Sequence, residues 1–274
     1  IISIVYKFYN SLESFYDNNE NINNVCLPKR LTLVFGYWEI VENNKHNIKH
    51  YEDNIIKTFS LLKNYDIIFY YNNSKYVNII NNVLDNSNNI KFIYRKIENL
   101  PAYKYSKKFL LLCKNQNNNS LNKINNEKGL VHYNRELKNG DSNYKKIMTI
   151  WFSKLYLVKE CIENNYYNNN DIAWCDISIT KLSNKIMKHT NFYKLDNISN
   201  KIIIFDNLMN YKGNNLKIGA SFIKSNKNKF MEFINKYIDE FENFNENYCH
   251  DEETIMNLVY NKNKGDFIIL KGYN

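Results

Sequence analysis

Three short apolar runs alternate with two amphipathic segments near the start of the chain, and this alternation limits the fold more than any other feature. The runs cover residues 31–37, 66–71 and 90–95, and each is rich in the β-branched and aromatic residues of buried strands. Between them, residues 51–64 and 75–86 carry apolar side chains at helical spacing. Strands that alternate with helices pair in parallel, so the sequence predicts an α/β fold with a doubly wound sheet.

The second half of the chain continues the alternation with a long helix and further strands. The expected helices cover residues 144–164, 182–189 and 226–242, with a last one that opens near residue 251. The expected strands cover residues 171–179, 201–205, 216–223 and 267–270. In the third of these strands, Gly219, Ala220 and Ser221 are typical of a bend where a ligand or another backbone comes close. Residues 115–126 form a polar, low-complexity tract, for which we expect a weakly ordered surface loop.

Charge and cysteine usage exclude several classes of function. The chain has 37 Lys and Arg against 28 Asp and Glu, a net charge of +9, but the basic residues are scattered, which argues against nucleic acid as a partner. The five cysteines are widely spaced without a C-x-x-C motif, so we expect no zinc cluster or disulfide framework and a reducing, cytoplasmic location. No apolar run is long enough for a membrane span, and no signal peptide is visible.

Asp176 is the first candidate functional residue. It ends an apolar run that includes Trp174 and Cys175, and a buried strand has no place for an unpaired carboxylate. We therefore expect Asp176 at the carboxyl end of its strand, where an α/β sheet opens into its ligand crevice. There it holds a metal ion or a sugar hydroxyl, or it caps the next turn.

Gly36, Arg95 and Lys154 are further candidates. Gly36 and Arg95 lie at the carboxyl ends of predicted strands, and a glycine there lets the backbone approach a ligand. Lys154 shares the inner side of its helix with Trp151 and Leu155. Its ammonium either extends outward to water or reaches a phosphate in the crevice.

An acidic cluster, Asp251-Glu252-Glu253, follows His250 and opens the last helix. Acids in a first turn complement the helix dipole, and that alone explains the cluster without a catalytic role.

The ordered set of these elements resembles the bacterial HtrL/YibB family of the GT-A glycosyltransferase superfamily. The resemblance spans residues 31–269 and includes, in order, residues 32–37, Tyr51, residues 67–70, Arg95, Tyr144, Ser153-Lys154, Ala173-Trp174-Cys175-Asp176 and His250-Asp251-Glu252. It implies a GT-A-like α/β fold, in which helices flank a mixed, mainly parallel central sheet. It also implies a hexosyltransferase-type enzyme of glycan biosynthesis that moves a sugar from a nucleotide-sugar donor to a hydroxyl of a glycan or protein.

For the donor, the resemblance implies that Gly36 and Tyr37 line the base and ribose site and that Arg95 and Lys154 face the diphosphate. Asp176 would stand where GT-A enzymes have an Asp-x-Asp motif, but this chain has Ser178 in place of the second Asp.

The resemblance also implies a divalent metal, Mn²⁺ or Mg²⁺. Such ions need hard oxygen ligands, usually two or more from the protein. Asp176 would supply one, and His250 or Asp251 could complete the set.

For the acceptor, the resemblance implies a base that removes the proton from the hydroxyl if the reaction inverts. Asp251 and Glu252 are the candidates, beside the segment 219–222 that should line the acceptor side. Glu253 is one residue further along the helix, and we expect it to point away from the crevice.

The expected domain organisation follows from the same resemblance. Residues 1–30 would be an N-terminal extension or leader strand, and residues 31–274 a single domain. Residues 31–143 would form its nucleotide-binding half and residues 144–274 its acceptor half.

A second reading is a non-catalytic GT-A-like domain that binds glycan or protein within a larger polypeptide. The loss of the second Asp and the start at Ile1 rather than Met favour that reading. A basic nucleic-acid-binding protein rests on net charge alone and ranks last.

Overall fold

The computed structural model describes residues 31–41, 46–116, 123–181 and 200–272. The expected extension at residues 1–30, the expected helix at 182–189 and the centre of the polar tract, residues 117–122, lie outside the described residues.

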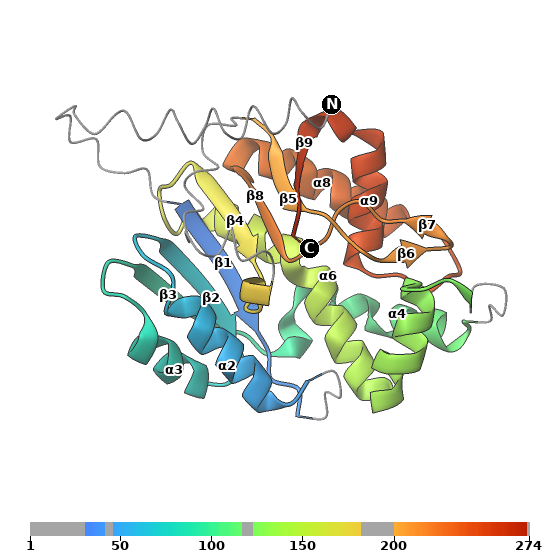
Figure 1. The fold of residues 1–274 in the computed structure, drawn as a ribbon, viewed down its shortest axis with the longest axis horizontal. Helices are drawn as coiled ribbons and strands as arrows, with labels where there is room; N and C mark the ends of the chain where they lie inside the picture. Colours follow the sequence, from blue (N-terminus) through green and yellow to red (C-terminus); the bar gives the residue numbers. More distant parts are fainter. Residues whose placement is uncertain (1–30, 42–45, 117–122, 182–199, 273–274) are drawn as a thin grey trace.

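The core of the described chain is a seven-stranded sheet with the order β3-β2-β1-β4-β8-β5-β9 (Figure 1). Its strands are β1 (Leu31–Tyr37), β2 (Asp66–Tyr71), β3 (Asn89–Tyr94), β4 (Asp171–Cys175), β5 (Ile202–Phe205), β8 (Phe222–Asn226) and β9 (Phe267–Leu270). All neighbours pair in parallel except β8, which runs antiparallel to both β4 and β5. A two-residue ladder of β6 (Asn210–Tyr211) and β7 (Asn214–Asn215) stands apart from this sheet.

The helices connect the strands and cover both faces of the sheet. The α-helices are α2 (Ile48–Phe59), α3 (Lys75–Val83), α4 (Ser106–Lys114), α5 (Lys128–Val131), α6 (Asp141–Asn164), α8 (Lys227–Asn243) and α9 (Glu252–Lys262). Short 3₁₀ turns are η1 (Ile97–Asn99), η2 (Pro101–Tyr105), η5 (Leu137–Asn139), η6 (Ile179–Lys181) and η8 (Lys264–Asp266), and η4 (His132–Glu136) is a π-helical turn.

Two hydrophobic cores lie on opposite faces of the sheet, because successive residues of a strand point to opposite sides. On one face, Leu33 and Phe35 of β1 pack with α2 and α3. On the other face, Val34 of β1 and Trp174 of β4 pack with α4, α6, α8 and α9. Figure 1 shows α2 and α3 beside β1 to β3, and α8 and α9 beside β5, β8 and β9. The structure thus confirms the predicted α/β class, with helices around a mixed, mainly parallel sheet.

The predicted strand at residues 216–223 is wrong over most of its length. Only Phe222 and Ile223 belong to a strand, and residues 216–221 run irregularly beside α9. The reason is the side chain of Asn257 on α9, which replaces a neighbouring strand. Its Oδ1 accepts the N–H groups of Lys217 (2.7 Å) and Ile218 (3.2 Å), and its Nδ2 donates to the carbonyl of Ile218 (2.8 Å).

Gly36, next to the end of β1, leaves room for two tryptophan rings against its main chain. A Cβ atom on Gly36 would lie 2.4 Å from the ring of Trp38 and 3.3 Å from the ring of Trp174. The indole of Trp38 is buried, and its Nε1–H donates to the carbonyl of Arg95 at 2.8 Å. The ring therefore has little freedom to move away.

We expect Gly36→Ala to lower the free energy of unfolding by about 1–3 kcal/mol, the usual cost of overpacking a core. Urea denaturation measures this change. Gly265→Ala is the matched control, because a Cβ atom there has no neighbour within 4 Å among the described residues. Equal stability of the two variants would contradict the tight packing at Gly36.

Candidate active site

Several strand ends meet at one edge of the sheet. β1 ends at Tyr37, β4 at Cys175 and β5 at Phe205, and the antiparallel β8 begins at this same edge. The main chains are joined there, since the N–H of Asp176 donates to the carbonyl of Ser221 at 2.8 Å. As predicted, Asp176 directly follows the last residue of its strand.

A cleft with two connected parts opens at this edge. One part, of about 370 Å³, is lined from the end of β1, from α2 and from the residues after β4, and is called the β1 half. The other, of about 350 Å³, is lined from α5, from the segment after β5 and from the start of α9, and is called the α9 half. Trp151, Lys154 and Asp176 line both parts, so the two halves adjoin at these residues.

The β1 half is rich in aromatic rings. Its lining includes Tyr37, Trp38, His46, His50, Tyr51, Trp151 and Trp174. Tyr37 and Tyr51 lie with ring centroids 5.4 Å apart. The hydroxyl of Thr58 on α2 donates to the carbonyl of Ile177 at 2.6 Å and so holds the lining segment that follows β4. Flat apolar walls with a few polar groups suit a ligand with a planar ring.

Lys154 of α6 points its ammonium into the junction of the two halves. The side chain is 9% exposed, and its Nζ lies 3.2 and 3.3 Å from the two carboxylate oxygens of Asp176 and 3.2 Å from Oε1 of Glu252. Burial alone would lower the pKa of this ammonium, but the charges of Asp176 and Glu252 outweigh burial and raise the pKa above its ordinary value. Lys154 therefore stays charged inside the cleft, and the alternative that it extends to bulk water is wrong.

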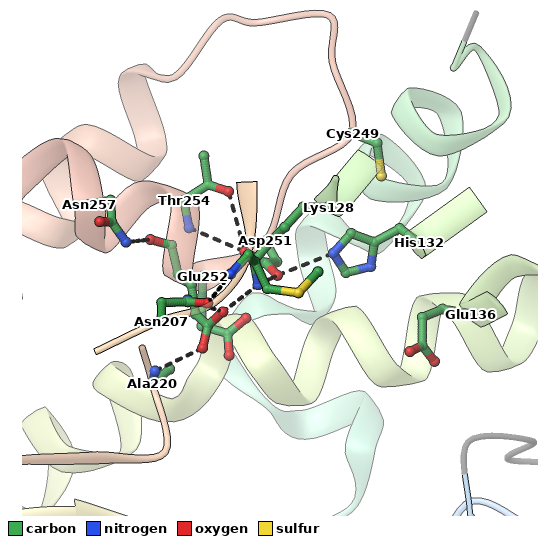
Figure 2. Close-up of polar contacts among 12 residues, drawn as sticks. Lys128, His132, Glu136, Asn207, Ala220, Cys249, Asp251, Glu252, Thr254 and Asn257 are labelled. Carbon is green, nitrogen blue, oxygen red and sulfur yellow. Dashed lines mark hydrogen bonds and ion pairs between the residues drawn. The ribbon is translucent and has the colours of Figure 1, made fainter. Parts of the chain in front are cut away.

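Asp251 is the N-cap residue of α9 and is 1% exposed. Its Oδ1 accepts the N–H of Thr254 at 3.2 Å, and its Oδ2 contacts the ammonium of Lys128 and lies 3.1 Å from Nε2 of His132 (Figure 2). Burial would raise the pKa of Asp251, but the charge of Lys128 and the contact with His132 hold it well below its usual range. Both carboxylate oxygens are thus used to hold the structure together.

Glu252 has a different environment from its neighbour. Its Oε1 is paired with Lys154, whereas its buried Oε2 has no hydrogen-bond partner among the described residues. Burial raises the pKa of Glu252 to about 7; the ammonium of Lys154 opposes this shift, and the charges of Asp251 and Glu253 add to it. Of the three acids at the start of α9, Glu252 is the one that exchanges a proton near neutral pH.

Glu253 does not point away from the crevice, contrary to expectation. It lines the α9 half, contacts the ammonium of Lys128, and accepts hydrogen bonds from Asn207 Nδ2 (2.7 Å) and from the N–H of Ala220 (2.9 Å). The first turn of α9 forms a wall of the cleft, with Lys128 on one side and the segment 216–221 on the other. A residue in that turn therefore finds partners inside the cleft.

The other predicted site residues fall into two groups. Gly36, Tyr37 and Ser178 line the β1 half. Arg95 is not among the described residues that line the cleft; its guanidinium forms two hydrogen bonds with Glu160 of α6, at 2.5 and 2.9 Å. Arg95 and Lys154 therefore do not line the same half of this cleft.

His250 is also buried away from the described lining of the cleft. Its Nδ1 lies 3.0 Å from the carbonyl of Tyr248, and its ring packs against Phe152 and Phe244. Burial lowers the pKa of His250 to about 4, so the ring is neutral at physiological pH. His250 and Asp176 are therefore not placed to hold the same metal ion.

The residues at Asp176 do not fit a divalent metal ion. Among the described residues, no group of three or more His, Cys, Asp and Glu side chains is placed to hold a metal. Asp176 Oδ1 already accepts the indole N–H of Trp174 at 2.8 Å, and both carboxylate oxygens face the ammonium of Lys154. A divalent ion at this carboxylate would lie close to the ammonium of Lys154 and would be repelled by its charge.

The turn formed by α5 and η4 contributes residues that the sequence did not reveal. Lys128 and His132 line the α9 half, and Glu136 lines the β1 half with a buried Oε2 that has no partner in the described chain. In Figure 2, Glu136 lies apart from the acids of α9. In the sequence, the one sign of close packing in this turn was Gly129, the only glycine between Gly36 and Gly140. A Cβ atom there would lie 2.5 Å from the ring of Tyr248.

Comparisons with known proteins give only distant similarities. The sequence matches no protein-family model and no curated protein, so the predicted relation to the HtrL/YibB family stays a prediction. Among solved structures, the chain is similar to the apo form of mouse xyloside xylosyltransferase 1, with 9% identity and a TM-score of 0.44, over 88% of this chain and 84% of that one.

Two further solved structures show similarity at the same distance. One is 4-diphosphocytidyl-2C-methyl-D-erythritol synthase from Anaerococcus prevotii (12% identity, TM-score 0.42, 90% of this chain and 88% of that one). The other is the apo bifunctional glycosyltransferase WbbM (12% identity, TM-score 0.44, 92% of this chain but 40% of that one). Similarities with TM-scores below 0.5 do not assign an activity to this chain, so its function is inferred from its own site. In the described part of the chain, no helix has the length and apolar character to cross a membrane.

We expect Asp251→Asn to destabilise the fold by about 3–5 kcal/mol, because it leaves the buried ammonium of Lys128 with one carboxylate fewer. Thermal or urea unfolding measures the loss. Asp239→Asn on the exposed face of α8 is the control and should change stability by less than about 0.5 kcal/mol. A silent Asp251→Asn variant would contradict a structural role for this carboxylate.

The raised pKa of Glu252 predicts a specific pH dependence of stability. Since the pKa is about 7 in the folded protein and 4.5 ordinarily, ionisation of Glu252 opposes folding. Wild-type protein should therefore lose roughly 2–3 kcal/mol relative to Glu252→Gln as the pH rises from about 5 to about 8. Urea unfolding of both proteins across this range measures the difference. The lowered pKa of His250 is present in both proteins, so it does not produce the difference between them. A difference that stays constant across this pH range would contradict the raised pKa of Glu252.

Proposed function

We propose that this chain is a glycosyltransferase that moves a sugar from a nucleotide-sugar donor to a hydroxyl group of a glycan or protein acceptor. The observation that carries the proposal is a buried cation, Lys154, where the two halves of the cleft adjoin, with a carboxyl of near-neutral pKa, Glu252, beside it. Group transfer from a nucleoside diphosphate needs both: a positive charge for the leaving group and a base for the acceptor.

The donor occupies the β1 half in this proposal. The rings around Tyr37 and Tyr51 offer stacking surfaces for a nucleotide base, and Gly36 and Ser178 lie where the ribose and phosphates follow. The diphosphate then reaches the ammonium of Lys154, which is the charged donor group common to both halves. Arg95 is paired with Glu160 and makes no contact with phosphate in this proposal.

The acceptor occupies the α9 half, with Glu252 as the general base. In a direct displacement, the acceptor oxygen bonds to the anomeric carbon while its proton passes to Glu252. The bond from the anomeric carbon to the phosphate oxygen breaks, and the leaving diphosphate carries its electron pair toward Lys154. The pKa of Glu252, raised to about 7 by burial, suits this carboxyl to accept the proton near neutral pH.

Two measurements test this function. A thermal-shift panel of nucleotide sugars should identify a donor that raises the melting temperature, because a ligand that binds only the folded state stabilises it by mass action. With that donor, Glu252→Gln should keep donor affinity and lose transfer or donor hydrolysis by roughly 10²–10⁴-fold.

Glu232→Gln is the matched control, because Glu232 is an exposed residue of α8 that pairs with Lys229. It should retain wild-type turnover. Full turnover in Glu252→Gln would remove Glu252 from the proposed mechanism, and a panel without any stabilising donor would overturn the proposed function itself.

A non-catalytic binding domain is the second candidate. One observation favours it: Asp176 keeps its oxygens on Lys154 and Trp174, in place of the paired acids of the resembled superfamily. Slow hydrolysis of the bound donor separates the two candidates, because a domain that only binds leaves the donor intact.

A further inference from the structure

We propose that the ammonium of Lys154 takes the place of a divalent metal ion, so that a nucleoside diphosphate binds this cleft without added metal. This inference rests on the proposed function, since it concerns how the same site holds the donor diphosphate. It assigns Lys154 as a binding residue and Asp176 as the positioning residue that holds it.

The surroundings of Lys154 are those of a cation site. Among the described residues, its Nζ has oxygen neighbours from Asp176 (3.2 and 3.3 Å), Glu252 (3.2 Å) and the carbonyl of Ala220 (3.5 Å). Carboxylate and carbonyl oxygens are also the ligands that divalent cations take in proteins. The side chain is buried, so this charge is placed by the fold and is not an exposed lysine that happens to lie near.

Asp176 is arranged to hold an ammonium rather than a metal. Its Oδ1 accepts the indole N–H of Trp174 at 2.8 Å, which fixes the plane of the carboxylate. The same indole ring lies below the ammonium, with Nζ 5.9 Å from its centroid, a distance at which a cation is attracted to the ring face. One tryptophan thus orients the acid and also favours a positive charge beside it.

The location of Lys154 matches the task that a metal performs in donor binding. It is the one lysine among the described residues that line both halves of the cleft, so it lies where donor and acceptor meet. A charge fixed by the protein stabilises a leaving diphosphate without any reorganisation at the moment of reaction. The second acid of an Asp-x-Asp motif would have no cation left to hold, which accounts for Ser178 at that position.

Isothermal titration calorimetry of the full chain with UDP, GDP, CDP and ADP tests this inference. Each titration is run once with EDTA and once with Mn²⁺. We expect at least one nucleoside diphosphate to bind with the same dissociation constant, within about twofold, in both buffers. Lys154→Met should weaken that binding by roughly 10- to 100-fold, the effect of losing a charge-assisted hydrogen bond.

Lys159→Met is the matched control, since Lys159 lies on the same helix and pairs with Glu163 near the surface. It should bind as wild type does. Lys154→Met leaves the buried carboxylate of Glu252 and the partly exposed carboxylate of Asp176 without this cation. If the single variant does not fold, the double variant Lys154→Met/Glu252→Gln removes the buried one. Loss of binding in the folded double variant, together with retained binding in Glu252→Gln, supports the inference equally.

The contrary outcomes separate this inference from the proposed function. Affinity that appears only with Mn²⁺, or rises tenfold or more with it, overturns the inference and leaves the proposed function standing. Wild-type affinity in Lys154→Met overturns the inference in the same way. A chain that binds no nucleoside diphosphate in either buffer overturns both.

Discussion

Burial of five charged groups at the start of α9 is the constraint on which the rest of the site depends. Lys128 and Lys154 face Asp251, Glu252 and Glu253, and each of these side chains is withdrawn from water wholly or in large part. A buried charge costs several kcal/mol unless opposite charges and hydrogen bonds surround it. The α5 turn, the segment 216–221 and the first turn of α9 must therefore all be in place together. The geometry of the cleft follows from this mutual requirement.

Three consecutive acids acquire three different properties because each meets a different environment. Both oxygens of Asp251 are hydrogen-bonded, and this carboxylate stays ionised. Glu253 is held by the ammonium of Lys128, the side-chain amide of Asn207 and the main-chain N–H of Ala220. Glu252 alone keeps an oxygen without a partner in the described chain, and its pKa lies near 7. Environments that push the pKa values of neighbouring carboxyls apart are the usual way in which one acid becomes reactive while the next stays structural.

The sequence predicted the parts of this structure that local patterns determine. Apolar runs located β1, β2 and β4 within a residue or a few residues of their ends, and the rule that ligands bind at strand ends placed Asp176 correctly. Glu253 was misjudged because its partner Lys128 is distant in sequence and no local pattern indicates it. The pairing of Arg95 with Glu160 was not foreseen for the same reason. The polar stretch around Lys128 lacks periodicity, so nothing in it indicated a wall of the cleft. Residues 216–221 look like a strand locally, but the amide of Asn257 takes over their hydrogen bonds.

The position of β4 between β1 and β8 has a consequence for how the chain is made and folded. Leu31 pairs with Asp171, and Asp171 pairs in turn with Asn226, so the centre of the sheet closes across very long loops. Such non-local pairing makes folding slow, because the chain loses the entropy of a long loop before the stabilising contacts between its ends have formed. During synthesis, Lys128 and Lys154 emerge well before the acids of α9, and in the growing chain they remain solvated. The cleft is therefore completed only after α9 has been synthesised and has packed against the α5 turn and α6.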